Sequence, residues 1–345
     1  MTSNNLPSTN SLSAWVTSLY RLLDTQLLAR VVLAGVLSLI IVKWIGDVTI
    51  YMSADAAKRA DYHQAILDNQ PVDGKSWMEM GAEGLNVRLL TVYVAEQLHV
   101  KFDKDLAFIY QLIDLVCVFA LLLVVHAYLR HWFDELGATM GMLLLGALLP
   151  LSMFQHLFHP WDKPSILLWA TMSLMLCKGW LTGFCVAYAL SVVVKFDALT
   201  AAAMIWFAGV SRQTLVRPTV VSGAVLAMGL IIFEILLTYL PGGVGPRDVM
   251  DQLQRNYLQF RALGIAYPPL LVHGMLAIFG LLAWRSGDLL ARRLWLCGLV
   301  VLLPHLLFTN FAEVRAQFGT VICMLPLALC ALGVRPQHRH ALQIL

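Results

Sequence analysis

The stretch His159-Pro160-Trp161-Asp162-Lys163-Pro164-Ser165 interrupts a long apolar run with two prolines and a pair of opposite charges. A proline lacks the N–H group that a helix interior needs, and it pushes the preceding residue out of the helical region. We therefore expect these seven residues to form a sharp turn between two apolar helices.

The composition around this turn is that of a membrane protein. Of the 345 residues, 59% are hydrophobic and 13% are charged, whereas a soluble domain carries about 25% charged residues. Apolar segments recur nearly end to end, so we expect a single all-α polytopic domain in the lipid bilayer. Tryptophan is enriched at the headgroups, which predicts that depth for Trp161. The net charge of +3 does not call for a nucleic-acid partner.

About ten transmembrane helices are predicted within one transmembrane domain, residues 27–334. An N-terminal tail with an interfacial helix, residues 1–26, precedes it, and a tail of residues 335–345 follows. Residues 46–105 are expected to be a long loop with amphipathic surface helices, one of them from Asn86 to Val100. The predicted spans are 27–45, 106–128, 136–154, 165–177, 180–194, 198–210, 219–240, 268–284, 294–309 and 317–334. Spans 165–177 and 180–194 are short for a core of about 30 Å, so they form either an incomplete hairpin or a crossing of thinned bilayer.

Lysine and arginine counts give the orientation. One side of the predicted topology carries eleven of these residues and the other carries six, leaving out the long loop and Lys43 at a span boundary. The positive-inside rule then places both termini in the cytoplasm and the long loop outside. The turn around Asp162 is expected on the same outer side.

Two further breaks in the apolar pattern repeat the charge chemistry of the turn: Lys195-Phe196-Asp197, and the segment with Glu313 and Arg315. All three breaks fall on the outer side, and we predict that they line one site with the long loop. Taken singly, each pair can also be explained as a neutralised pair that stabilises a turn, but chance is a poorer explanation for all three on one side. Asp114 and Glu234, inside apolar spans, are explained either by contacts between helices or by proton coupling.

These residue types suit group transfer from a lipid-linked phosphate. Lysine and arginine bind phosphate, and a carboxylate can take the proton of an attacking hydroxyl. Asp47, which directly follows the first span, is the best candidate for this base, and Asp55 and Asp162 are alternates. His156 and His159 beside one Asp are a weak metal pattern, so no metal site or other cofactor is indicated, although a divalent metal stays possible.

At these residues the sequence resembles bacterial membrane glycosyltransferases of the GT-C type. The turn 159–165 looks like their aromatic-Pro-aromatic-Asp-x-Pro-Ser motif, and Lys195-Phe196-Asp197 is similar to their basic-x-acidic motif. Glu313 and Arg315 resemble their Glu-x-Arg motif, and Arg88 falls in a stretch like their Arg-x-Leu. The chain departs from the pattern at His159, Lys163 and Asp197, and the first loop lacks the adjacent acidic pair of some GT-C enzymes.

The resemblance implies an enzyme of the bacterial cytoplasmic membrane that moves a sugar from a polyprenyl phosphate to a glycan, lipid or protein acceptor at the extracytoplasmic face. Lys163, Lys195 and Arg315 would hold the lipid phosphate, Asp197 and Glu313 would orient those cations, and Arg88 would support the loop or the phosphate. His159 and Trp161 of the turn would also contact the substrate. Two alternatives stay open: a polysaccharide polymerase or ligase that uses a lipid-diphosphate oligosaccharide, and a transporter or flippase of lipid-linked sugars.

Overall fold

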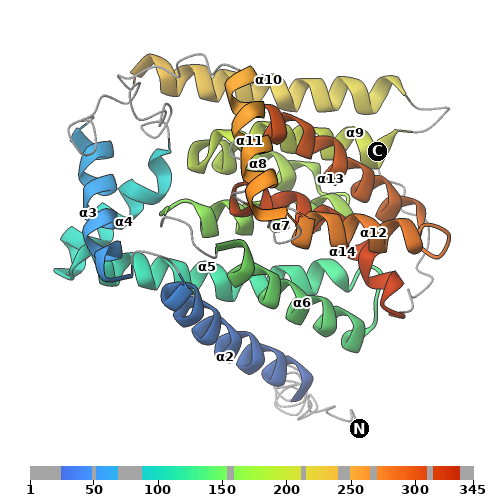
Figure 1. Ribbon diagram of the computed structural model, residues 1–345, viewed down its shortest axis with the longest axis horizontal. Helices are drawn as coiled ribbons and strands as arrows, with labels where there is room; N and C mark the ends of the chain where they lie inside the picture. Colours follow the sequence, from blue (N-terminus) through green and yellow to red (C-terminus); the bar gives the residue numbers. More distant parts are fainter. Residues whose placement is uncertain are drawn as a thin grey trace, which may run out of the picture.

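The computed structural model describes residues 25–48, 52–68, 88–153, 159–210, 215–239, 249–264, 270–308 and 314–334. Within these ranges the chain is an elongated bundle of helices with no strand, which confirms the all-α prediction for this part (Figure 1). The α-helices are α2 (Thr25–Val48), α3 (Met52–Asp68), α4 (Leu89–Phe102), α5 (Leu106–Leu129), α6 (Glu135–Met153), α7 (Asp162–Cys177), α8 (Leu181–Val194), α9 (Ala203–Gly209), α10 (Val216–Tyr239), α11 (Val249–Leu263), α12 (Met275–Leu282), α13 (Leu289–Phe308) and α14 (Phe318–Ala331).

Three short turns of non-α helix continue directly into α-helices. They are η2 (Phe196–Ala202) before α9, the π-helical η4 (Leu270–Gly274) before α12, and η5 (Val314–Gln317) before α14. Lys195 separates α8 from η2 with an extended backbone, at φ −162° and ψ 114°. The break that the sequence placed at Lys195 is therefore a real interruption of the helix.

Within the described ranges, four helices are long and apolar enough to cross a bilayer: Gln26–Gly46, Leu106–Leu129, Glu135–Met153 and Val216–Thr238. Four shorter apolar helices accompany them: Leu181–Val194, Phe196–Gly209, Leu271–Leu282 and Phe318–Ala331. The chain is thus a helical protein compatible with a membrane.

The helices of the predicted long loop and the two most exposed apolar helices occupy different parts of the bundle. Helices α3 and α4, both within the predicted long loop, gather at one end, which we call the site end (Figure 1). Helices α2 and α10 lie along opposite edges of the molecule (Figure 1). Their apolar side chains, such as Val32 and Val220, are mostly exposed, as expected for helices that face lipid.

The core lies between these edges. Helix α5 packs against α2, α6 and α7, and α14 packs against α12, α13 and α7. Close approach of α14 to α7 depends on Gly319, because a Cβ atom there would overlap the indole ring of Trp169. The glycine therefore fixes how near these two helices come.

Replacing Gly319 by alanine is expected to lower the unfolding midpoint in detergent, because overpacking a core costs about 1–3 kcal/mol. Gly35→Ala in α2 is the matched control, because a Cβ atom at Gly35 meets nothing within 4 Å. Alanine favours a helix over glycine, so this control should leave the midpoint unchanged or raise it. Equal midpoints for the two variants would contradict the close packing of α14 on α7.

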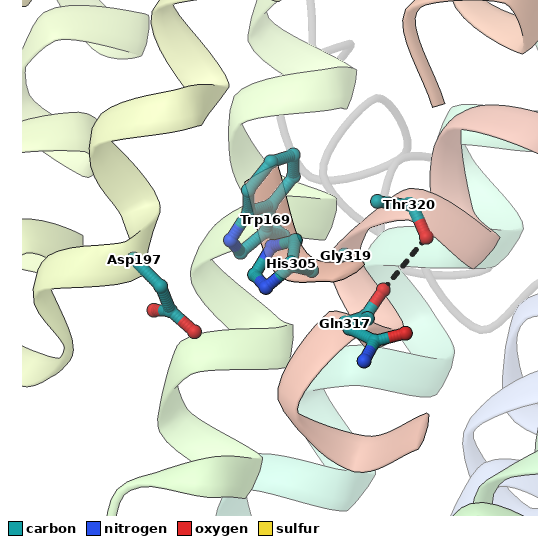
Figure 2. A pocket seen from close by; sticks show the side chains of 6 residues that line it. All are labelled: Trp169, Asp197, His305, Gln317, Gly319 and Thr320. Atoms are coloured by element: carbon teal, nitrogen blue, oxygen red, sulfur yellow. Dashed lines mark hydrogen bonds between the residues drawn. The ribbon is translucent and has the colours of Figure 1, made fainter. Parts of the chain in front are cut away.

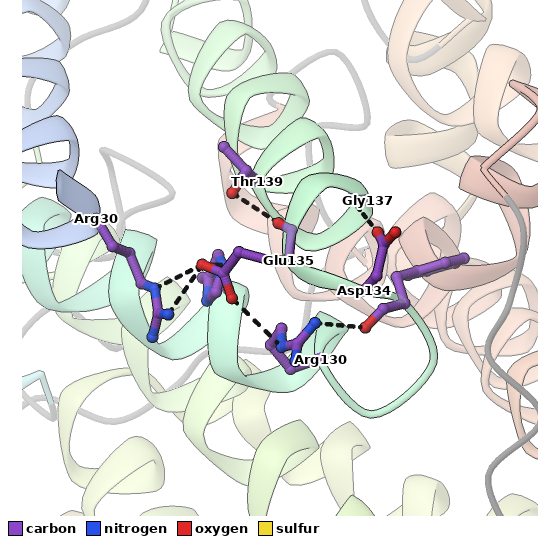
Figure 3. Close-up of polar contacts among 8 residues, drawn as sticks. Arg30, Arg130, Asp134, Glu135, Gly137 and Thr139 are labelled. Carbon is purple, nitrogen blue, oxygen red and sulfur yellow. Dashed lines mark hydrogen bonds and ion pairs between the residues drawn. The ribbon is translucent and has the colours of Figure 1, made fainter. Parts of the chain in front are cut away.

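A polar cluster ties three helices together away from the site end (Figure 3). The Glu135 carboxylate accepts a hydrogen bond from Arg30 Nε at 2.9 Å and lies 3.1 Å from His126 Nε2 and 3.5 Å from Arg130 Nε. Arg130 lies sixteen positions after Asp114 on α5, which corresponds to about 24 Å along the helix. This cluster fastens the sparsely packed α2 to the turn between α5 and α6.

Several expected boundaries are wrong. The turn spans only His159 to Trp161, and α7 begins at Asp162, so Lys163 is helical although it precedes Pro164. The first turn of a helix tolerates proline because its N–H groups have no partner within the helix. Trp161 is fully buried inside the protein, and its depth in the bilayer stays a prediction. Asp47 directly follows the first candidate span, Gln26–Gly46, as expected, and it lies in the last turn of α2, which continues to Val48.

Candidate functional site

The first half of the site centres on Asp114, about two turns into α5. Its Oδ2 atom lies 3.4 Å from Arg59 Nη2 of α3 and 3.3 Å from Lys163 Nζ of α7. One carboxylate oxygen is therefore shared by two cations from different helices. The prediction of a contact between helices holds for Asp114, whereas Glu234 is exposed on α10.

The second half centres on Lys195, at the interruption after α8. Its Nζ atom lies 3.6 Å from Asp162 Oδ1 and 3.0 Å from Asp197 Oδ2. Asp162 and Lys163 are neighbours in the first turn of α7, so the backbone of this turn joins the two halves. We call these six residues the charged network: Arg59, Asp114, Asp162, Lys163, Lys195 and Asp197.

The charged network is buried and electrically balanced. Relative exposure is 7% for Arg59 and lower for Asp114, Asp162, Lys163 and Lys195, and the Asp197 side chain is 16% exposed. Three cations and three carboxylates alternate, and each buried ion costs several kcal/mol in lost hydration. Within the described part of the chain, the second oxygens (Oδ1) of Asp114 and Asp197 have no hydrogen-bond partner. Each of these two oxygen atoms can therefore still accept a hydrogen bond inside the network.

Arg88, at the start of α4, joins the two predicted breaks. Its guanidinium lies 4.8 Å from the ring centre of Trp161 and 5.5 Å from that of Phe196. These aromatic residues directly precede Asp162 and Asp197 in sequence. Trp161 also packs with Ile66 of α3 in an apolar cluster. Cation–π contacts and apolar packing therefore hold α3 and α4 over the charged network.

A small cavity adjoins the second half of the network, between Asp197 and His305 (Figure 2). Its volume is about 10 Å³, the space that one water molecule needs. The other lining residues are Trp169, Gln317, Gly319 and Thr320. Thr320 Oγ1 donates to the Gln317 carbonyl at 2.7 Å and lies 2.9 Å from His273 Nε2. Polar groups thus continue from Lys195 into the core around α14.

A hydrogen-bonded triad stands beside the first half of the network. His63 Nδ1 lies 2.8 Å from the Tyr110 hydroxyl, and His63 Nε2 contacts Glu96 Oε2 of α4. Burial lowers the pKa of His63 below its ordinary value of 6.5, and the neighbouring Glu96 carboxylate opposes that shift only in part. The imidazole is therefore neutral at neutral pH.

The structure describes the remaining predicted site residues to different extents. Asp47 and Asp55 are described by their backbones alone, in the last turn of α2 and the first turn of α3. The His159 ring lies 5.1 Å from the Trp161 ring. Glu313 and the Arg315 side chain lie outside the described residues. Gln317, at the end of η5, lines the same cavity as Asp197.

Sequence reasoning missed Arg59, His63, Glu96, Tyr110 and His305 as parts of the site. Arg59 and His63 are four residues apart, the spacing that puts two side chains on one helix face. A signal for Asp114 was available, because an ionisable residue within an apolar span marks a functional site by default. Among the described residues, no group of three or more His, Cys, Asp or Glu side chains is arranged to hold a metal ion.

Comparison of the chain with protein-family models, with curated proteins and with solved structures finds no match.

Proposed function

We propose that the protein is a membrane glycosyltransferase that moves a sugar from a polyprenyl-phosphate donor to a glycan, lipid or protein acceptor. The proposal includes a GT-C-like arrangement of about ten spans in a bacterial cytoplasmic membrane. It places both termini in the cytoplasm and the site end at the extracytoplasmic face. The observation that carries the proposal is the meeting of Lys195 with Asp162 and Asp197 beside Lys163.

Buried ions of this kind are difficult to explain by stability alone. Replacement of a buried ion pair by well-packed apolar residues of similar volume often leaves the stability of a protein unchanged or raises it. Here three cations and three carboxylates form four ion pairs beside α3 and α4 at one end of the bundle. Lysine and arginine bind phosphate as cations, and a carboxylate partner keeps a lysine charged and oriented. We assign Lys163 and Lys195 to the lipid phosphate, and Asp162 and Asp197 to positioning Lys195.

The proposed reaction is a displacement at the anomeric carbon of the donor sugar. The acceptor oxygen forms a bond to that carbon, and the bond between the carbon and the phosphate oxygen breaks. The electron pair leaves with the phosphate, where the lysines stabilise the added charge. A carboxylate takes the proton of the acceptor hydroxyl. Asp47 in the last turn of α2 and Asp55 in the first turn of α3 are the candidate bases, because Asp162 is assigned to positioning Lys195.

The test is reconstitution of the full chain in vesicles with a panel of polyprenyl-phosphate hexoses and pentoses and a glycolipid extract as acceptor. We expect release of polyprenyl phosphate and a product extended by one sugar. Transfer of a whole oligosaccharide from a lipid diphosphate would instead identify a polymerase or ligase. Absence of transfer from every donor would contradict the proposal.

A transporter or flippase of lipid-linked sugars is the second candidate. The helix interruption at Lys195 and the burial of Asp114 favour it, because transporters place ions at broken helices within the membrane. The two functions differ in what happens to the donor. An enzyme consumes it at one face, whereas a flippase moves intact donor across the vesicle membrane. Accessibility of the donor to an added sugar-oxidising reagent separates these outcomes.

A further inference from the structure

Two polar side-chain pairs, which we call rungs, join α3 to α5. Arg59 pairs with Asp114, and His63 pairs with Tyr110. The two members on each helix are four residues apart, so the rungs lie one helical turn from each other. One rung belongs to the charged network, and the other leads away from it.

The second pair continues from His63 to Glu96, and side-chain exposure rises from Tyr110 to Glu96. Tyr110 is fully buried, His63 is 2% exposed, and the Glu96 side chain is 29% exposed. The Tyr110 ring is fixed by packing against Ala95 of α4. The triad therefore connects a buried hydroxyl beside Asp114 with a carboxylate that water reaches.

The partners also fix the tautomer of His63. A phenol at neutral pH donates its proton, so Tyr110 donates to Nδ1 of the neutral imidazole. Nε2 must then carry the imidazole proton and donate it to the Glu96 carboxylate. This is the order of donors and acceptors in which a histidine takes a proton from a hydroxyl while a carboxylate stabilises the imidazolium.

We propose that Tyr110, His63 and Glu96 form a proton-exit route from the charged network to water. The proposal rests on the function proposed above, because sugar transfer releases one proton from the acceptor hydroxyl. A proton that arrives at the Tyr110 oxygen displaces the hydroxyl proton to His63 Nδ1. The Nε2 proton then passes to Glu96 and on to water. One proton enters and one leaves, and the imidazole is left with its proton on Nδ1. A turn of the ring brings that proton back to the Glu96 side and resets the relay. Tyr110, His63 and Glu96 are relay and positioning residues, and none is assigned a contact with substrate.

The pH dependence follows from the groups around the His63 ring. They are Glu96 and His99 of α4 and Tyr110 of α5. Arg59 of α3 and Asp114 of α5 act on Tyr110. A protonated His63 cannot accept the proton of Tyr110. The transfer rate of the wild-type protein should therefore fall as the pH drops below 6.5, through the lowered pKa of His63.

The experiment compares transfer rates between pH 5 and 8 for the wild-type protein, His63→Gln and Tyr110→Phe in vesicles. We expect His63→Gln to lose the acid limb of the profile and to be about tenfold or more slower near neutrality. Added imidazole, which supplies an external base, should restore part of its rate. Tyr110→Phe should also be slower. His131→Gln is the matched control, because His131 follows the end of α5 opposite to Tyr110 and makes an edge-to-face contact with Trp132.

The outcomes separate the two proposals. If the wild-type protein transfers no sugar, the proposed function itself fails. If it transfers sugar but His63→Gln keeps the acid limb, the relay is overturned, whatever the rate of the variant. The unfolding midpoint of each variant, measured in parallel, shows whether a lower rate reflects a lost fold.

Discussion

Replacement of Asp114 by asparagine is expected to lower the free energy of unfolding by about 3–5 kcal/mol, the cost of removing one partner from a buried ion pair. The reason is geometric. A single oxygen, Asp114 Oδ2, serves both Arg59 and Lys163 at 3.4 and 3.3 Å. Asparagine keeps the shape of the side chain but removes the charge that both cations share. Denaturant titration in mixed micelles, followed by tryptophan fluorescence, measures the change.

Glu234→Gln supplies the matched control for this variant. It also removes a carboxylate from an apolar helix, but Glu234 is exposed on α10. Its effect should stay within about 0.5 kcal/mol or be stabilising. The double variant Asp114→Asn/Lys163→Met removes one of the two buried cations as well, and it should regain part of the loss. Equal stability of Asp114→Asn and Glu234→Gln would show that Asp114 does not hold the network together.

The fold was predictable where apolar patterning alone decides the structure. The segments around α2, α5, α6 and α10 are long and apolar, and each is a single helix. The start of α7 was not predictable in this way, because hydropathy assigns charged residues to turns. Asp162 and Lys163 instead form the first turn of α7, where Lys195, directly after α8, and Asp114 on α5 compensate their burial.

The site was predictable in its local part. Lys195 and Asp197 are two residues apart, and their pairing needs only the backbone around Phe196. The pairing of Arg59 with Asp114 spans fifty-five positions and depends on how α3 packs on α5. The packing of Trp161 was not predictable for a related reason. The residues that cover it come from α3 and α4 and include Arg88, and they are far from it in sequence.

Replacement of Lys195 by methionine is expected to reduce sugar transfer about 10²–10³-fold, the typical loss when one preorganised group that stabilises developing charge is removed. Lys195 is the cation shared by Asp162 and Asp197. Lys195→Arg keeps the charge but offers a planar fork in place of a point charge, so it should retain part of the activity. Lys178→Met is the matched control, because Lys178 is exposed between α7 and α8, at the far end of α8 from Lys195. Its transfer rate should match that of the wild-type protein.

A second variant separates the catalytic role of Lys195 from a structural one. Lys195→Met alone leaves the carboxylates of Asp162 and Asp197 without the cation that they share, so it should also destabilise the fold. Lys195→Met/Asp197→Asn restores the charge balance, and its unfolding midpoint should return toward that of the wild-type protein. If Lys195 stabilises the leaving phosphate, transfer stays low in this variant because the cation is still missing. Recovery of transfer together with stability would instead show that Lys195 only neutralises its neighbours.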